Sequence, residues 1–73
     1  MRSFRTIYMV EKLSKDVFGN YDIAIRRFAC NKAIAEKIAR KISKYANDEV
    51  DEIHVTKLSK WEWQFVNMLE VER

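Results

Sequence analysis

Residues 31–46 constrain the fold most strongly, because their apolar and charged side chains separate on a helical period. One side gathers apolar residues: Ile34, Ala35, Ile38, Ala39, Ile42, Tyr45 and Ala46. The other side carries a cationic stripe at i, i+3, i+4 and i+7: Lys37, Arg40, Lys41 and Lys44. Asn31 stands where an N-cap residue belongs. The pattern predicts an amphipathic helix with one face in a core and one face open to an anionic partner.

The length of 73 residues allows one hydrophobic core, and we predict a single compact domain over residues 1–73. Hydrophobic residues make up 48% of the chain, which is enough to fill such a core and argues against disorder. Cys30 is the only cysteine, so no internal disulfide is expected. Cys30 and His54 are the only soft metal ligands in the sequence, so we predict neither a metal nor a cofactor.

The apolar residues are scattered, and no run approaches the length of a membrane span. The charged start of the chain is followed by alternation instead of the apolar block of a signal peptide. A lone cysteine without an export signal predicts a cytoplasmic protein that does not act at a membrane.

Alternating apolar and polar residues predict strands over residues 4–13, 21–28, 53–58 and 61–71, the last being the longest. Gly19 and Asn20 supply the turn signal between the first two strands. With the helix in the middle, the order is ββαββ. We therefore predict an α+β fold, an antiparallel sheet of about four strands with one helix packed on one face.

Alternation also predicts which side chains face the helix. The expected set is Tyr8, Val10, Ile23, Ile25, Ile53, Val55, Trp63, Phe65 and Leu69. A single helix leaves the second face of the sheet open, and several apolar residues fall there. Ile7, Met9, Val66 and Met68 are expected to form an interaction patch on that face, for a protein partner or a homodimer. The alternative is ordinary apolar exposure, or cover by a turn of the chain.

The charge distribution is lopsided. Residues 1–44 hold eleven Lys or Arg against four acids, and residues 45–73 hold three against seven. The helix stripe, with Arg26 and Arg5 as neighbours, is therefore the candidate binding surface for a protein partner or a nucleic acid. The alternative is a solvated outer face that keeps the protein soluble.

Three further groups have simpler interpretations. Trp61, Trp63 and Phe65 have the spacing of a base-stacking platform, but Glu62 between the tryptophans favours a core role. The acids of residues 48–52 lack the spacing of a calcium loop and indicate a solvated turn. A nucleophile–base pair and a phosphate-binding glycine loop are both missing, so no enzymatic activity is predicted.

In layout the whole chain resembles small phage-encoded anti-CRISPR proteins that inhibit multi-subunit crRNA-guided surveillance complexes. The resemblance lies in the alternating opening strand of residues 6–11, the short basic helix of residues 35–40, and a closing hairpin formed by residues 53–55 and the Trp-rich strand. It is one of size and element order, and it assigns no residue roles. It implies a non-catalytic protein in the cytoplasm of a phage host that occupies surfaces meant for target DNA.

The function expected from the sequence is a small non-enzymatic inhibitor. It would bind and block a nucleic-acid-handling protein complex through the basic helix face. One alternative is direct nucleic-acid binding with little sequence preference. Another is a homodimerising interaction module.

Overall fold

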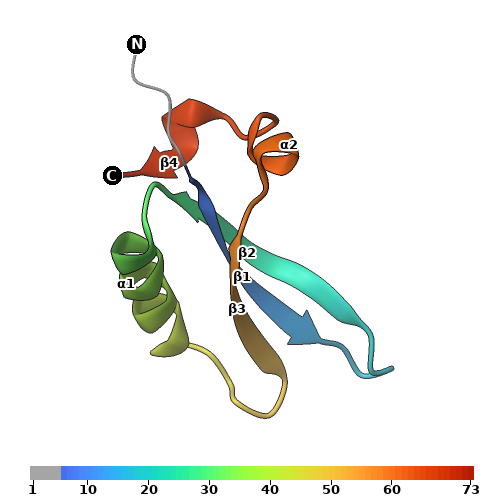
Figure 1. The fold of residues 1–73 in the computed structure, drawn as a ribbon. Helices are drawn as coiled ribbons and strands as arrows, with labels where there is room; N and C mark the ends of the chain where they lie inside the picture. The colour runs from blue at the N-terminus through green and yellow to red at the C-terminus, as the bar shows by residue number, and fades with distance from the viewer. Residues whose placement is uncertain (1–5) are drawn as a thin grey trace.

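The computed structural model describes residues 6–73 and has an α+β fold. The sheet order is β3-β1-β2-β4, and one main helix packs on the sheet (Figure 1). The elements in chain order are β1 (Tyr8–Lys15), β2 (Tyr21–Ala29), α1 (Lys32–Ser43), β3 (Asp51–Lys57), α2 (Lys60–Trp63), the 3₁₀ helix η1 (Met68–Glu70) and β4 (Val71–Glu72). The predicted fold class and element order are confirmed, although part of the predicted first strand, residues 4–5, lies outside the described residues.

The turn between β1 and β2 forms where the sequence predicts it. Gly19 has a φ of 85°, a conformation that costs a side-chain-bearing residue energy. The Asp16 carboxylate accepts hydrogen bonds from the backbone N–H groups of Phe18 and Asn20, at 2.8 and 2.9 Å. These bonds satisfy the amides of the turn and set the antiparallel pairing of β1 with β2.

Helix α1 begins as predicted at the Asn31 cap. The Asn31 side-chain oxygen accepts a 2.9 Å hydrogen bond from the Ile34 N–H. The helix ends at Ser43, three residues before the predicted end. Ala35 and Ile38 are buried against Val10 of β1 and Ala29 of β2 in the first core cluster.

The sheet is mixed, which corrects the prediction of an antiparallel sheet. β1 pairs antiparallel with β2 and β3, but β4 runs parallel to β2 and pairs only Val71 with Phe28 and Glu72 with Ala29. Most of the predicted last strand is instead helical or irregular. The reason is local: the Ser59 hydroxyl accepts from the Glu62 N–H while the Glu62 carboxylate accepts from the Ser59 N–H. This capping box starts a helix where alternation suggested a strand.

The second face of the sheet is covered at one end, which corrects the predicted interaction patch. Ile7 is fully buried with Leu58 and Val71 in a second core cluster. The partly buried residues packed against it include Met9, Val66 and Met68. The segment from α2 to β4 folds back over this end of the sheet (Figure 1), so Ile7 is a core residue, whereas Met9, Val66 and Met68 remain partly exposed beside it.

A β-bulge changes the predicted facing of β2. Lys12 pairs with Ile25 and Leu13 with Ile23, so Ala24 is skipped in the register. Directly opposed residues share a face, and successive residues of β1 point to opposite faces. Ile25 therefore faces the α1 side, whereas Ile23, predicted to face the helix, lies on the other side. The extra residue reverses the alternation, and nothing in the apolar pattern reveals it.

Candidate functional site

A groove of about 330 Å³ runs beside α1, between the helix and the β2 side of the sheet. Helix α1 contacts β1, β3 and β2, and Arg27 of β2 lines the groove beside it. The C-terminal residues Glu72 and Arg73 close one end, because β4 pairs with the last residues of β2.

Cations surround an apolar floor in this groove. Lys37 and Lys41 line it from α1, Arg27 from β2 and Arg73 from the C-terminus, and Glu72 is the one acid in the lining. The floor consists of three isoleucines one helical turn apart: Ile34, Ile38 and Ile42. Such a lining attracts an anionic group through its walls and buries an apolar side chain on its floor.

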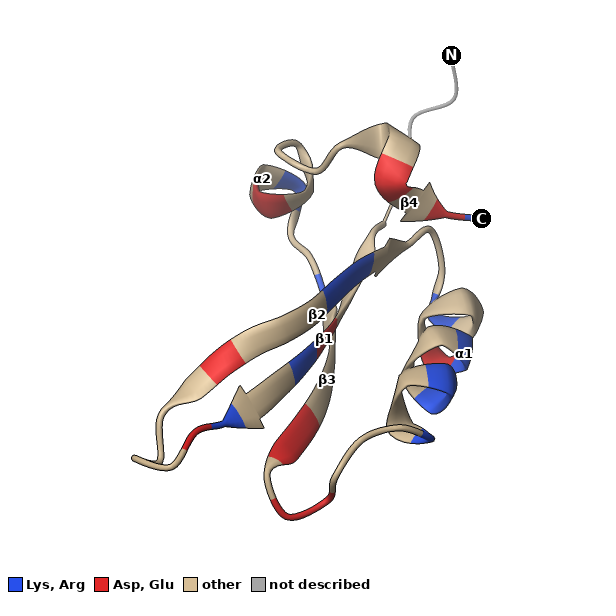
Figure 2. Ribbon diagram, turned by 180° about the vertical axis from the view of Figure 1, so that it is seen from behind, with Lys and Arg blue, Asp and Glu red and all other residues tan. Residues whose placement is uncertain are grey.

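The predicted cationic stripe is divided by this geometry. Lys37 and Lys41 point along the flank of α1 that faces the groove, and both are exposed. Arg40 and Lys44 are exposed as well but lie outside the groove lining, and Lys44 is the C-cap residue beyond the last turn. Figure 2 shows the basic positions gathered along α1. The stripe is therefore a real surface feature, and two of its four members border the groove.

Arg26 does not belong to this site. Its Nε and Nη2 both donate to Glu11 Oε2, at 3.1 and 2.8 Å. Glu11 is its direct partner in the β1–β2 register, on the face opposite α1. The other predicted neighbour, Arg5, lies outside the described residues.

Arg27 is the groove residue that the sequence prediction left out. It pairs with Val10, a residue of the first core cluster, and so lies on the α1 side of the sheet. The signal was present in the sequence, because adjacent residues of a strand point to opposite faces and only one of two consecutive arginines can join a given surface. The register between β1 and β2 decides which of the two arginines lies on the helix side.

The aromatic residues near the C-terminus do not form a stacking platform or a shared core. Trp63 packs against the second core cluster, as the core interpretation expects. Trp61 and Phe65 are 78% and 84% exposed, which corrects the prediction that these two are core residues. The helical turn of α2 separates rings that a strand would have kept on one face.

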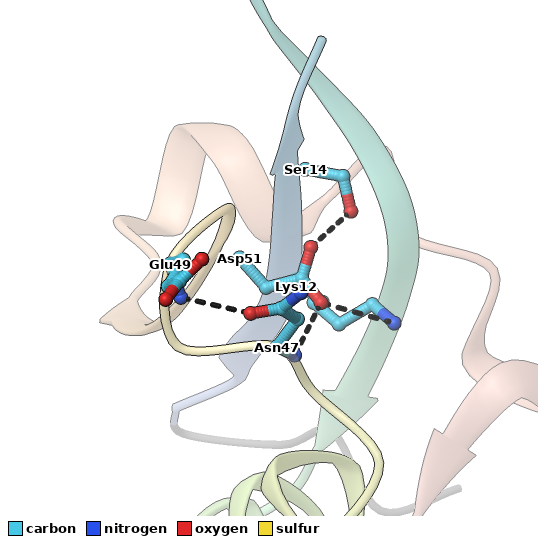
Figure 3. A network of polar contacts seen from close by, with 5 residues as sticks. All are labelled: Lys12, Ser14, Asn47, Glu49 and Asp51. Carbon is cyan, nitrogen blue, oxygen red and sulfur yellow. Dashed lines mark hydrogen bonds and ion pairs between the residues drawn. The ribbon is translucent and has the colours of Figure 1, made fainter.

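The acidic turn before β3 is held by a polar network (Figure 3). Asp51 accepts hydrogen bonds from the Ser14 hydroxyl at 2.6 Å and the Asn47 N–H at 2.9 Å, and Lys12 Nζ lies 4.0 Å from its carboxylate. The Asn47 side chain in turn accepts from the Glu49 N–H at 3.0 Å. The Ser14 hydrogen bond, followed by that from Asn47, lowers the pKa of Asp51 below its ordinary value of 3.8. Asp51 thus stabilises the turn as a carboxylate.

The described residues contain neither a membrane-spanning helix nor a metal-ligand cluster. No helix of residues 6–73 has the length and apolar character needed to cross a bilayer. Within that same range, no three His, Cys, Asp or Glu side chains come together as ligands for a metal ion. No family model, curated protein or solved structure matches this chain.

Proposed function

We propose that this protein is a small non-enzymatic inhibitor that binds and blocks a nucleic-acid-handling protein complex through the α1 groove. The observation that carries the proposal is the convergence of Arg27, Lys37 and Lys41 around an isoleucine floor. Proteins that handle nucleic acid hold acidic segments as well as basic channels on their surfaces, and an acidic segment bound here would be unavailable to its normal partner. Cationic walls speed the encounter, and buried apolar contacts prolong the complex.

The lining favours a protein ligand over a nucleic acid. Platforms for unpaired bases are built chiefly from aromatic rings, and none of the residues that line the groove is aromatic. An isoleucine floor instead suits an apolar side chain from a peptide segment. Glu72 within the lining would repel a continuous run of phosphates but can accept a hydrogen bond from a peptide. An acidic segment with at least one apolar side chain is therefore the ligand that fits best.

The layout resemblance suggests the first complex to test, a multi-subunit crRNA-guided surveillance complex. The assay measures binding of labelled target DNA by the purified complex, with and without this protein. The double variant Lys37→Glu/Lys41→Glu should lose inhibition, because it replaces two groove cations by anions. The matched control is Lys15→Glu/Lys32→Glu, which makes the same charge change at exposed positions outside the groove.

Two results would contradict the proposal. Equal inhibition by the groove and control variants would show that the cationic groove is not the binding surface. Strong binding of the protein to duplex DNA alone would instead favour direct nucleic-acid binding. In that case the logarithm of the binding constant should fall with the logarithm of the salt concentration, with a slope of about −0.9 per phosphate contact.

A further inference from the structure

The outer edge of β3 is a second candidate interaction surface. β3 is the terminal strand of the sheet, and all seven of its residues pair with β1 without a bulge. Its residues from His54 to Lys57 are exposed, and Val55 has 41% of its surface accessible. Terminal strands commonly carry bulges, very short pairings or charged side chains that prevent the addition of another strand. β3 has no bulge and no short pairing, and its charged residues lie near its two ends.

The register identifies the backbone groups that face outward. Leu58 N–H donates to the Ile7 carbonyl at 2.9 Å, and Lys15 N–H donates to the Val50 carbonyl at 2.7 Å. In an antiparallel ladder, alternate residues direct both backbone groups toward the same neighbour. Glu52, His54 and Thr56 therefore bond to β1. The backbone groups of Ile53, Val55 and Lys57 point away from the sheet.

Charge is unevenly distributed along this segment, which is acidic at its start and basic at its end. Asp48, Glu49, Asp51 and Glu52 precede or open the strand, whereas Lys57 and Lys60 close or follow it. A strand with an acidic start and a basic end is complementary to itself in the antiparallel direction. Opposite charges on facing strands stabilise a pair, and like charges directly opposed destabilise it.

We propose that β3 pairs antiparallel with β3 of a second copy of this chain, about a two-fold axis at His54. In this register Ile53 faces Val55 of the second copy, and Asp51 faces Lys57. The same outward-facing residues then form the hydrogen-bonded pairs, as an antiparallel ladder requires. Beyond the strand ends, Lys60 lies opposite Asp48. The two sheets become one continuous eight-stranded sheet, because each copy contributes its four strands.

This interface is distinct from the α1 groove, because the groove lies on the β2 side of the helix and β3 is the opposite edge of the sheet. The dimer does not depend on the proposed inhibitory function, and a protein that stays monomeric could still inhibit through the groove.

The first test is the mass of the wild-type protein in solution across a concentration series, by analytical ultracentrifugation. The expected result is a monomer–dimer equilibrium. Lys57→Glu places a glutamate opposite Asp51 at both ends of the interface and should weaken the dimer roughly tenfold. Lys32→Glu makes the same charge change outside the strand and should leave the equilibrium unchanged. A monomer at every concentration would overturn the proposal.

The register itself is tested by cysteine crosslinking, with Cys30→Ala in every variant so that a single thiol remains. His54→Cys places two thiols across the axis in a non-hydrogen-bonded pair with a Cα separation of about 4.5 Å, which suits a disulfide. Thr56→Cys is the control on the same face, because its two copies would lie about 14 Å apart. We expect the His54→Cys protein to crosslink much faster on mild oxidation. A dimer in which both variants crosslink at equal rates would contradict this register.

Discussion

The Ser14 hydroxyl at the end of β1 donates a 2.6 Å hydrogen bond to the Asp51 carboxylate at the start of β3. The two residues are directly paired in the sheet although 37 positions separate them in the chain. Asp51 also accepts from the Asn47 N–H, so one carboxylate joins the strand pair to the connection that leads from α1. This contact ties the end of β1 to the start of β3, in the register that both strands share.

The first prediction concerns the pH dependence of stability. Hydrogen bonds lower the pKa of Asp51 in the folded state, so folding favours its ionised form. The resulting stabilisation is fully present above the ordinary pKa of 3.8 and is lost as the pH falls through the lower folded value. Asp51→Asn should therefore have a lower free energy of unfolding than the wild type near neutral pH. The difference in free energy between the two proteins should disappear in acid. Urea denaturation at several pH values measures this difference.

Asp48→Asn is the matched control for that experiment. Asp48 lies exposed in the same connection, so its replacement makes the same charge change away from the Ser14 contact. A stability gap between Asp51→Asn and the wild type that stays constant from neutral pH down to acid would contradict the assigned role of the carboxylate.

The second prediction concerns the second core cluster. Ile7 is fully buried there, whereas Leu69, in the nearby 3₁₀ helix, is 94% exposed. Ile7→Ala should lower the free energy of unfolding by about 2–5 kcal/mol, because it removes buried methyl groups and leaves a cavity. Leu69→Ala should change it by about 0.5 kcal/mol or less. Comparable losses in the two variants, measured by thermal or urea unfolding, would show that the C-terminal segment covers the sheet differently.

The third prediction concerns the capping box of α2. Ser59→Ala removes the hydroxyl that accepts from the Glu62 N–H and should cost about 1 kcal/mol. Because α2 leads into the segment that covers Ile7, the amides of residues 60–72 should exchange with solvent faster, while those of α1 keep their protection. Hydrogen exchange read by NMR distinguishes this local loosening from a uniform loss of stability.

Much of the fold follows from local signals in the sequence. The Asn31 cap, the apolar stripe of α1 and the turn at Gly19 each depend on neighbouring residues, and all three are observed. The C-terminal segment was mispredicted because two local signals compete there. Alternation of Trp61, Trp63 and Phe65 favours a strand, whereas Ser59 and Glu62 have the capping-box spacing that favours a helix. In the structure the helix start prevails, with the Ser59 and Glu62 side chains each accepting from the other's backbone N–H.

Part of the candidate site could be predicted from local sequence signals, and part depends on strand pairing. Lys37 and Lys41 follow from the helical period alone, since the groove-facing flank lies beside the apolar stripe. Arg27 depends on the register between β1 and β2, which places it opposite Val10. The burial of Ile7 was not predictable from periodicity, because the residues that cover it come about fifty positions later in the chain, and periodicity describes only the face of a strand, without indicating what covers it.

The last prediction separates two adjacent arginines. Arg27 lines the groove beside Lys37, whereas Arg26 is bound to Glu11 on the opposite face. Arg27→Ala should weaken binding to the acidic target roughly tenfold at low salt. The difference in affinity between this variant and the wild type should decrease as added salt shortens the Debye screening length. Arg26→Ala removes the same charge and breaks a partly exposed ion pair worth at most about 1 kcal/mol of stability, without touching the groove. Calorimetric titration of both variants across a salt series tests the assignment. Equal losses of affinity would mean that overall positive charge, instead of the groove on the α1 side, holds the partner.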